Sequence, residues 1–285
     1  MEGRGRTQTR ARVITVNDGQ RRSRSDQIAV EEPLEIRLRA GDASERLAVT
    51  MRTPGHDFEL AAGFLFAEGL IAGRDELATI GYCLDRDLTE EQRYNVVTVD
   101  LRAPALPPIA GADRRFPVSS ACGVCGKTHL DQIERHGVTR VTSELTVSPD
   151  VITALPDRLR AAQGVFERTG GLHAAGLFTT TGDLIALRED VGRHNAVDKL
   201  IGWALLEGRL PLSEQIILVS GRTSFEITQK CAAAGVPILA AVSAPSSLAI
   251  DLATRFGMTL IGFLRGEQFN VYAGAWRVAQ LETPG

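Results

Sequence analysis

The chain has 285 residues, a net charge of −3, and 44% hydrophobic and 24% charged residues. It is long enough for one or two domains with a buried core, and its composition excludes disordered, collagen-like and disulfide-dense proteins. Because it has neither an apolar run long enough to span a membrane nor an apolar signal core at its N-terminus, we expect a cytoplasmic protein without a membrane partner. The chain has four cysteines, two of them in one short motif, which suits a reducing compartment in which thiols serve chemistry.

The charge is unevenly distributed along the chain. Residues 1–25 carry seven arginines against two acidic residues, so the remaining 260 residues have a net charge of −8. Because this basic segment lacks apolar periodicity, we expect residues 1–26 to be a disordered tail. A body this acidic argues against a nucleic-acid partner.

Residues 27–115 predict a small α+β module. Its expected elements are two strands within 27–52 around a Gly41-Asp42 turn, a helix opened by Thr53-Pro54 and ended by Gly69, and strands at 78–84 and 94–102. Residues 116–147 then form a connecting segment that contains the paired cysteines and a short helix at 128–136.

Residues 148–273 alternate between helices and strands, and 274–285 are left as a C-terminal tail. The expected elements are a helix at 148–168, a hairpin of strands at 173–180 and 184–187, a helix at 193–207, a strand at 215–219, a helix at 224–234, a strand at 237–242, a helix at 246–256 and a strand at 259–264. This alternation predicts an α/β domain with a largely parallel sheet and helical cover.

The paired cysteines lie in the sequence Ala-Cys-Gly-Val-Cys-Gly-Lys at 121–127. Two thiols at this spacing, Cys122 and Cys125, could exchange, form a disulfide or share a metal. Lys127 and the N-terminus of a following helix would lower a thiol pKa and so favour the reactive thiolate. The flanking glycines allow a loop that a partner can approach closely.

Four alternatives compete with an exchanging thiol pair in this motif. The cysteines could be buried and inert, but a glycine-rich loop is a poor place to bury them. Structural zinc would need two more ligands, and no second paired motif exists. A thioredoxin-like dithiol would follow a strand, whereas a proline-rich lead-in precedes this one. Ala121 to Thr128 also fits a relaxed phosphate-binding loop, although no hydrophobic strand comes before it.

Small and basic residues follow three of the predicted strands. If these strands are parallel, their following loops, 220–224, 243–247 and 265–268, meet at one edge of the sheet, where open α/β sheets bind ligands. Two of these loops lead into helix N-termini, so with the arginines they could bind an anion such as a pyrophosphate. The alternative is that the serines merely cap helices. The candidate ligand residues are Ser220, Gly221, Arg222, Ser243 and Arg265.

A polar segment at 188–199 gives a further candidate. On a helix from Arg193, His194 and Asp198 share a face and Lys199 lies near it, which fits a site lining or a salt-bridged helix start equally well. We include His194 among the candidate ligand residues. His173 is either a core histidine or a ligand contact.

Lysine is rare in this chain. Of 32 basic residues only Lys127, Lys199 and Lys230 are lysines. A lysine kept in such a chain is expected to sit where an ammonium is needed rather than a planar guanidinium.

Seven motifs stand in order along the chain. They are TPGHDFELAAGFLFAEGLI (53–71), ACGVCGK (121–127), RTGGLHAAGLF (168–178), EDVGRHNAVDKLIG (189–202), SGRTSFEITQK (220–230), AGVPILAAVSAPSSLAIDLA (234–253) and GMTLIGFLRGEQFNVY (257–272). In combination they resemble the FdhD/NarQ family of formate dehydrogenase accessory sulfurtransferases over roughly residues 27–273. One departure is Ser246, where the family pattern would have threonine, and the hydroxyl is kept.

The resemblance implies a sulfurtransferase that works as a sulfur carrier. Such a protein takes persulfide sulfur from a cysteine desulfurase and transfers it to a molybdenum (or tungsten) bis(pterin guanine dinucleotide) cofactor before that cofactor enters formate dehydrogenase. Cys122 would carry the persulfide, with Cys125 as its partner or relay. The cofactor-binding stretch would consist of Phe263, Leu264, Arg265, Gly266, Glu267 and Gln268.

The resemblance also implies the fold and the assembly. It predicts a cytidine-deaminase-like, three-layer α/β/α cofactor-binding domain with a smaller N-terminal α+β module, and a homodimer. The deaminase zinc signature is absent, so we expect neither zinc nor deamination. The expected partners are the desulfurase and the catalytic subunit of formate dehydrogenase, and a guanine nucleotide should mimic the cofactor. The alternatives are a cofactor-binding chaperone without sulfur transfer and a P-loop nucleotidase.

Overall fold

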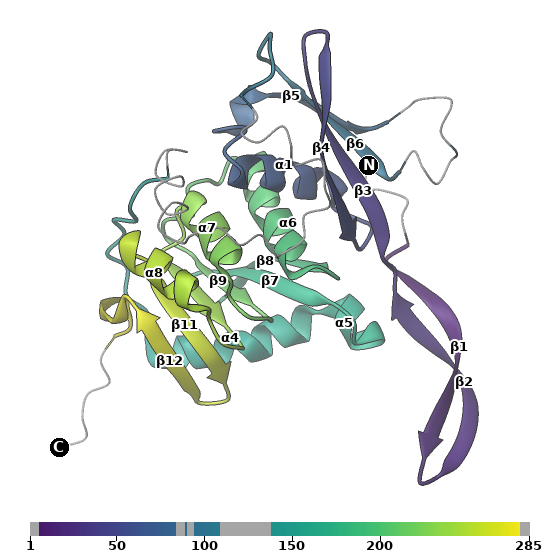
Figure 1. Cartoon of the computed structure of the whole chain (residues 1–285). Coiled ribbons are helices and arrows are strands. Elements are labelled where there is room, and N and C mark those ends of the chain that lie inside the picture. The colour runs from purple at the N-terminus through teal and green to yellow at the C-terminus, as the bar shows by residue number, and fades with distance from the viewer. Residues whose placement is uncertain (1–5, 84–88, 90–93, 109–137, 280–285) are drawn as a thin grey trace, which may run out of the picture.

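The computed structural model describes residues 6–83, 89, 94–108 and 138–279. Three sheets organise this part of the chain: a two-stranded hairpin, a four-stranded sheet and a six-stranded sheet (Figure 1). Within the described ranges, no helix is both long and apolar enough to cross a membrane. The combination of sheets and covering helices confirms the predicted α/β class.

The six-stranded sheet is the centre of the larger part of the molecule. In sheet order its strands are β12 (Gln268–Ala273), β11 (Thr259–Arg265), β10 (Ile238–Ala241), β9 (Ile216–Val219), β7 (His173–Phe178) and β8 (Leu184–Asp190). Strands β9, β10 and β11 are parallel, whereas β7 is antiparallel to both of its neighbours and β12 is antiparallel to β11. The prediction of a largely parallel sheet is therefore only partly right. The hairpin of β7 and β8 on one side of the parallel centre brings in the antiparallel strand β7, and the hairpin of β11 and β12 on the other side brings in the antiparallel strand β12.

Helices cover both faces of this sheet. They are α4 (Pro149–Ala162), α5 (Gly164–Thr169), α6 (Arg193–Leu206), α7 (Phe225–Ala233) and α8 (Ser247–Arg255). Apolar residues of α6, α7 and α8 form one core with one face of the sheet, and those of α4 form a second core with the other face. These layers give the expected α/β/α order. The helix predicted at 148–168 is divided in two, because Gln163 leaves helical geometry (φ −76°, ψ 71°).

A smaller sheet and one helix form the N-terminal module. Its elements are β3 (Glu32–Ala40), β4 (Ala43–Arg52), α1 (Asp57–Ala67), a short 3-10 helix (Arg74–Glu76), β5 (Leu77–Tyr82) and β6 (Val96–Leu101). The strand order is β4-β3-β6-β5, and alternate residues of β3 are buried against α1. Helix α1 packs in turn against α6 (Figure 1). A Cβ atom on Gly63 or Gly202 at this crossing would overlap the backbone of the opposite helix, so only glycine allows the approach.

Helix α1 begins later than predicted. The sequence places Thr53-Pro54 at its start, but the first helical residue is Asp57, and His56 precedes it in a left-handed conformation (φ 56°). The prediction is wrong because the N–H of Thr53 donates to the carboxylate of Asp190 in the larger domain, 3.1 Å away, and the threonine hydroxyl accepts from a backbone N–H there. Thr53 therefore joins two parts of the molecule instead of capping a helix.

The disorder predicted for residues 1–26 is wrong from residue 8 onwards. Strands β1 (Gln8–Asn17) and β2 (Gln20–Ala29) form an antiparallel hairpin with ten residue pairs, joined by Asp18 and Gly19 in left-handed conformations. An Asp-Gly pair between alternating strands is a strong hairpin signal, and the charge of this segment obscured it. The hairpin contacts the body at its base, where Arg168 Nε donates to Gln8 Oε1 at 2.9 Å, and otherwise projects away (Figure 1).

Residues 274–279 do not form a free tail. After a short 3-10 helix (Ala275–Arg277), Val278 pairs with Val147 in a parallel bridge. Arg277 is completely buried, and its guanidinium donates to the carbonyl oxygens of Ser143 and Gly257. Since the acceptors are backbone carbonyl groups, which every residue has, no acidic residue in the sequence marks Arg277 as a buried, hydrogen-bonded side chain.

Candidate functional site

Three parallel strands end at the same edge of the central sheet, as predicted. The loops after β9, β10 and β11 meet there, and β8 also ends at this edge and leads into α6. Helices α6, α7 and α8 all begin beside this edge, so their free backbone N–H groups point towards it. We define the edge site as Arg193 together with the loops 220–224, 243–246 and 265–268.

Internal hydrogen bonds hold the loops of the edge site in place. Ser220 Oγ accepts from the N–H of Ala174 at 2.9 Å, and the carbonyl of Ser243 accepts from the N–H of Phe263 at 3.2 Å. Ser224 and Ser246 cap α7 and α8, as the alternative interpretation of the serines predicts. Capping thus explains these two serines, but not the arginines beside them.

Several polar groups of the edge site are left for a ligand. Arg193 Nε and Thr223 Oγ1 are buried and, among the described residues, have no hydrogen-bond partner. Arg222 and Arg265 are exposed, and Arg265 uses one nitrogen, Nε, to donate to the carbonyl of Val242 at 3.1 Å. Buried donors without partners are costly, so their presence beside exposed arginines indicates an anion site.

The predicted cofactor-binding stretch turns the corner from β11 to β12 at this edge. Phe263 combines a left-handed backbone (φ 52°) with a ring that is 42% exposed, which is an unusual arrangement for a large apolar residue. Leu264 is fully buried, in the core that the sheet forms with α4. Gly266 is left-handed and exposed in the turn, followed by the exposed Glu267 and Gln268.

Two histidines flank the edge site. His194 Nε2 lies 3.1 Å from Ser224 Oγ and 3.0 Å from Glu226 Oε2, and this hydrogen bond holds the pKa of Glu226 below its usual value. Burial, together with the charge of Arg193, lowers the pKa of His173. A Cβ atom on Gly221 would touch the His173 ring, so this histidine borders the loop after β9.

A cavity of about 380 Å³ is lined by Gly192 and His194, the chain neighbours of Arg193. It lies between β4, α1, α6 and α7, and apolar residues such as Leu60 and Phe64 form part of its wall. Asp198, which shares the cavity with His194 as the helical spacing predicts, forms a 2.7 Å ion pair with Lys230. Both side chains of this pair are buried.

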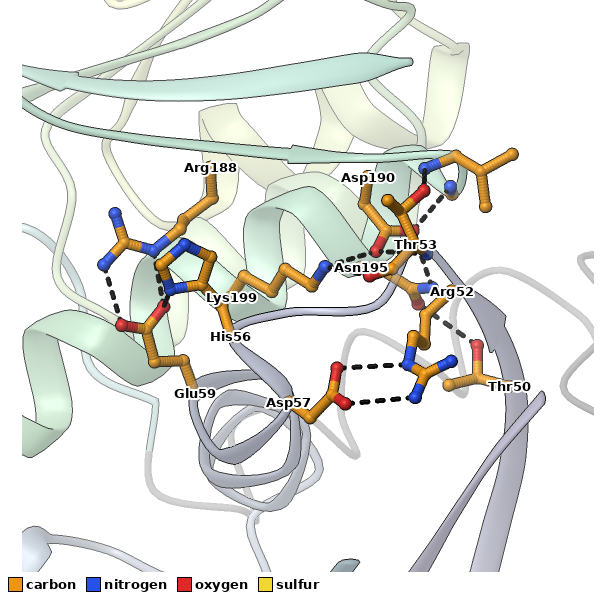
Figure 2. Close-up of polar contacts among 12 residues, drawn as sticks. Thr50, Arg52, Thr53, His56, Asp57, Glu59, Arg188, Asp190, Asn195 and Lys199 are labelled. Carbon is orange, nitrogen blue, oxygen red and sulfur yellow. Dashed lines mark hydrogen bonds and ion pairs between the residues drawn. The ribbon is translucent and has the colours of Figure 1, made fainter. Parts of the chain in front are cut away.

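Lys199 points the other way, towards the N-terminal module (Figure 2). Its Nζ lies 2.6 Å from Asp190 Oδ2 and donates to the carbonyl of Thr53 at 2.8 Å. Asp190 is completely buried and also accepts from the N–H of Gly192 and from Asn195 Nδ2, at 2.7 and 3.0 Å. Lys199 and Lys230 are therefore both ammonium groups in buried ion pairs, as the scarcity of lysine suggests.

Two further ion pairs continue this network (Figure 2). Arg52, 1% exposed, donates to both carboxylate oxygens of Asp57 at 3.1 and 3.0 Å. Arg188 pairs with Glu59, and although burial opposes ionisation, the hydrogen bonds from Arg188 and His56 hold the pKa of Glu59 below its usual value. We define the seam as Arg52, Thr53, Asp57, Glu59, Arg188, Asp190, Asn195 and Lys199.

The predicted sulfur-carrying residues, Cys122 and Cys125, lie outside the described residues, as does the relaxed phosphate-loop pattern. Of the described cysteines, Cys231 is completely buried, and burial raises the pKa of its thiol to about 12. Cys83 is half-buried at the end of β5. Cys231 is thus unsuited to carry sulfur, because the thiolate is the reactive form.

Comparison with known proteins gives a consistent result. The sequence model of the FdhD/NarQ family matches residues 29–279. A "Sulfur carrier protein FdhD" from Streptomyces avermitilis is 52% identical over 277 residues, covering 96% of this chain and 97% of that protein. Another of that name from Nocardia farcinica is 50% identical, with 96% of each chain covered. A crystal structure from Desulfotalea psychrophila, assigned as a formate dehydrogenase accessory protein, superposes with a TM-score of 0.73 at 26% identity, over 96% of this chain and 100% of that one.

Proposed function

The chain belongs to the FdhD/NarQ family, and from that premise we propose that it is a sulfurtransferase that carries sulfur for the maturation of formate dehydrogenase. Half of its residues are identical to those of relatives named sulfur carrier proteins, over nearly the full length of both. The solved relative, at lower identity, provides the association with formate dehydrogenase.

The sulfur is carried on Cys122, which the family motif at 121–127 singles out. The Cys122 thiolate attacks the terminal sulfur of a cysteine persulfide on a cysteine desulfurase. The S–S bond of that persulfide breaks and the desulfurase thiolate leaves, so this exchange involves no net oxidation or reduction. The terminal sulfur then passes to the metal of a molybdenum bis(pterin guanine dinucleotide), and Cys122 returns to the thiol. The reduced metal supplies the two electrons that convert this sulfur to sulfide, and Cys125 acts as partner or relay.

The unpartnered donors of the edge site are the observation that supports binding of this cofactor as a substrate. Pyrophosphate groups need several N–H donors and positive charge in one place. Three helix N-termini, the buried Arg193 Nε and two exposed arginines meet at this edge. We assign the pyrophosphate to Ser220, Gly221, Arg222, Ser243 and Arg265, and the adjoining part of the cofactor to Phe263 and Gly266 to Gln268.

The proposal includes its partners. A cysteine desulfurase supplies the sulfur, the catalytic subunit of formate dehydrogenase receives the finished cofactor, and the protein works as a homodimer in the cytoplasm. A guanine nucleotide should occupy part of the cofactor site. A cofactor-binding chaperone is the second candidate, because the edge site supports binding without any thiol.

Mass spectrometry of the sulfur-loaded protein tests the proposal. The reduced chain is incubated with an active cysteine desulfurase and cysteine, and its peptides are then weighed. We expect a gain of one sulfur atom on the peptide that contains Cys122, and no gain in the Cys122→Ala variant.

Cys83→Ala is the matched control, because it removes a described, half-buried thiol outside the motif. It should load as the wild type does. Absence of sulfur from the wild-type Cys122 peptide, with the desulfurase shown to be active, would overturn the carrier assignment and favour the chaperone.

A further inference from the structure

The hairpin of β1 and β2 projects from the body of the molecule with little support (Figure 1). Its base is attached beside α5, where Arg168 donates to Gln8, and most of its other residues are exposed. Within the described residues, neither edge of the hairpin has a neighbouring strand. Because an isolated two-stranded hairpin is at best marginally stable in water, one of ten residue pairs is expected to rest on another surface.

The two faces of the hairpin differ in charge and in exposed apolar surface. Residues directly opposite each other share a face, and residues alternate between the faces along each strand. We define the basic face by its three arginines and its two most exposed aliphatic residues: Arg10, Arg12, Arg21, Ile14 and Val16. Neither aspartate of the hairpin belongs to this face, since Asp18 lies in the turn and Asp26 pairs with Arg24 on the opposite face.

The charge of the hairpin is opposite to that of the rest of the chain. Residues 8–29 carry a net charge of +3, whereas residues 30–285 carry −7. Within the part of the chain that the structure describes, Arg10 and Arg21 form no ion pair. Two such hairpins side by side would bring like charges together, so an acidic surface is the better partner. The body of a second copy of this chain has that charge.

The area of the basic face also fits a dimer. Ten residues of strand extend about 34 Å, and two strands are about 10 Å wide, so one face covers roughly 340 Å². If each protomer lays its hairpin on the body of the other, the two faces and the two surfaces they cover bury about 1,400 Å² in total. Stable interfaces bury about 1,200–2,000 Å², so two exchanged hairpins are enough for one.

We propose that the hairpin is a docking arm whose basic face lies on the acidic body of a second copy of this chain. The inference rests on the homodimer of the proposed function and names the surface by which each protomer holds the other. Burial of Ile14 and Val16, which are 67% and 63% exposed in the single chain, supplies the apolar part of the contact. The arginines of the face select an acidic surface.

Two neighbouring arginines of β2 test the arm, because Arg21 lies on the basic face and Arg22 on the opposite face. Both side chains are exposed, so Arg21→Glu and Arg22→Glu change the net charge equally and neither disturbs a core. We expect Arg21→Glu to raise the dissociation constant of the dimer, measured by sedimentation equilibrium at low salt, by roughly tenfold or more. Arg22→Glu is the matched control and should stay within about threefold of the wild type.

The other outcomes separate the arm from the proposed function. Equal dissociation constants for the wild type and Arg21→Glu would overturn the arm but leave the homodimer intact. Equal weakening by both substitutions would also overturn it, because the effect would then follow net charge and not one face. A wild-type chain that stays monomeric at every concentration would remove both the arm and the homodimer. Slower sulfur loading of Arg21→Glu with an unchanged dimer would assign the basic face to the desulfurase instead.

Zero-length cross-linking tests the contact itself. The lysines among the described residues, Lys199 and Lys230, are buried, so Arg21→Lys places an amine on the basic face that a carbodiimide can couple to a touching carboxylate. In mixtures of isotopically labelled and unlabelled chains, we expect position 21 of one copy to be joined to an acidic residue within 30–279 of the other. Arg22→Lys is the control and should give less of this product. Equal yields from the two variants, or cross-links from position 21 only within its own chain, would overturn the arm.

Discussion

The seam and the edge site share one segment of the chain, where Arg193 of the edge site lies between Asp190 and Asn195 of the seam, yet the polar side chains of the two regions have opposite roles. In the seam, Asp190 is paired with Lys199 and accepts hydrogen bonds from Thr53, Gly192 and Asn195 (Figure 2). Three residues after Asp190, at the edge site, Arg193 Nε is buried with no partner among the described residues. The seam therefore uses its polar groups to join two modules, and the edge site keeps its own for a ligand.

The same contrast applies to two strained residues. His56, which contacts the seam at Glu59, and Phe263 at the edge site both have left-handed backbones, with φ of 56° and 52°. The His56 ring pairs with Glu59 at 3.2 Å, whereas the Phe263 ring is 42% exposed. Contacts within the fold compensate the strain at His56. At Phe263 the compensation is expected from a bound ligand, as is common where strain is kept at functional sites. Substitutions at the seam should thus cost stability, and those at the edge site should cost binding.

The largest expected effect is that of Lys199→Met. This change removes the ammonium and leaves the completely buried Asp190 carboxylate without its cation. Breaking a buried pair from one side typically costs about 3–5 kcal/mol, so the free energy of unfolding measured in urea should fall by about that amount.

Arg39→Met is the matched control, since Arg39 pairs with Asp100 on the surface of the N-terminal sheet. Exposed pairs contribute little, so this variant should unfold almost as the wild type does. If both variants had the same stability, the seam would not be the polar link between the modules that its geometry indicates.

A smaller effect, on binding alone, is expected from Arg265→Gln at the edge site. Arg265 is exposed, and its hydrogen bond within the described residues goes to the backbone carbonyl of Val242, so the free energy of unfolding should change by no more than about 0.5 kcal/mol. The lost guanidinium should weaken binding of GDP and of inorganic pyrophosphate by roughly tenfold, as calorimetry can measure.

The control for that variant is Arg209→Gln, beyond the opposite end of α6, where Arg209 packs over the ring of Trp203. Its affinity for pyrophosphate should equal that of the wild type. If Arg265→Gln lost stability but kept its affinity, Arg265 would stabilise the fold, as the seam residues do, and would not bind the ligand.

The edge site could be predicted from the sequence, because its residues follow directly after buried strands. Parallel strands place their following loops at one edge, so Ser220, Ser243 and Arg265 could be grouped without coordinates. The seam could not be predicted in the same way. Lys199 was singled out by the scarcity of lysine, but its partner contacts come from Asp190 and from Thr53, 146 positions away. Nothing local to either segment indicates such a pairing.

Local signals also account for the errors in the predicted fold. Thr53-Pro54 has the form of a helix start, but tertiary contacts of Thr53 outweigh it and α1 begins at Asp57. The arginines of residues 1–25 conceal a hairpin whose Asp18-Gly19 turn was visible in the sequence. At Thr53 a local capping signal was outweighed by tertiary hydrogen bonding, whereas at Asp18-Gly19 a valid local turn signal was overlooked in favour of composition.

The smallest expected effect is a pH dependence that belongs to the edge site alone. Burial and the nearby charges of Arg193 and His194 lower the pKa of His173, while Asp190 opposes this shift. A histidine with a depressed pKa favours the neutral form in the folded chain. Its contribution to stability is therefore complete above the usual histidine pKa and is lost as the pH falls below that value. An anion bound beside Gly221 would instead favour the charged form, so binding should be accompanied by proton uptake.

As the pH falls, protonation of His173 should thus lower the stability of the free chain but favour the bound state. Between pH 8 and 6, the affinity of the wild type for GDP should increase relative to that of His173→Asn, which cannot take up the proton. Comparing the two proteins at each pH cancels the titration of the nucleotide's own phosphate. The seam provides the contrast, since the pKa of Glu59 is held low by Arg188 and His56, and no change of its charge is expected in this range. If the affinities of the wild type and His173→Asn changed with pH in the same way, the protonation of His173 would not be coupled to anion binding. His173 would then be a core histidine with a structural role, like the residues of the seam.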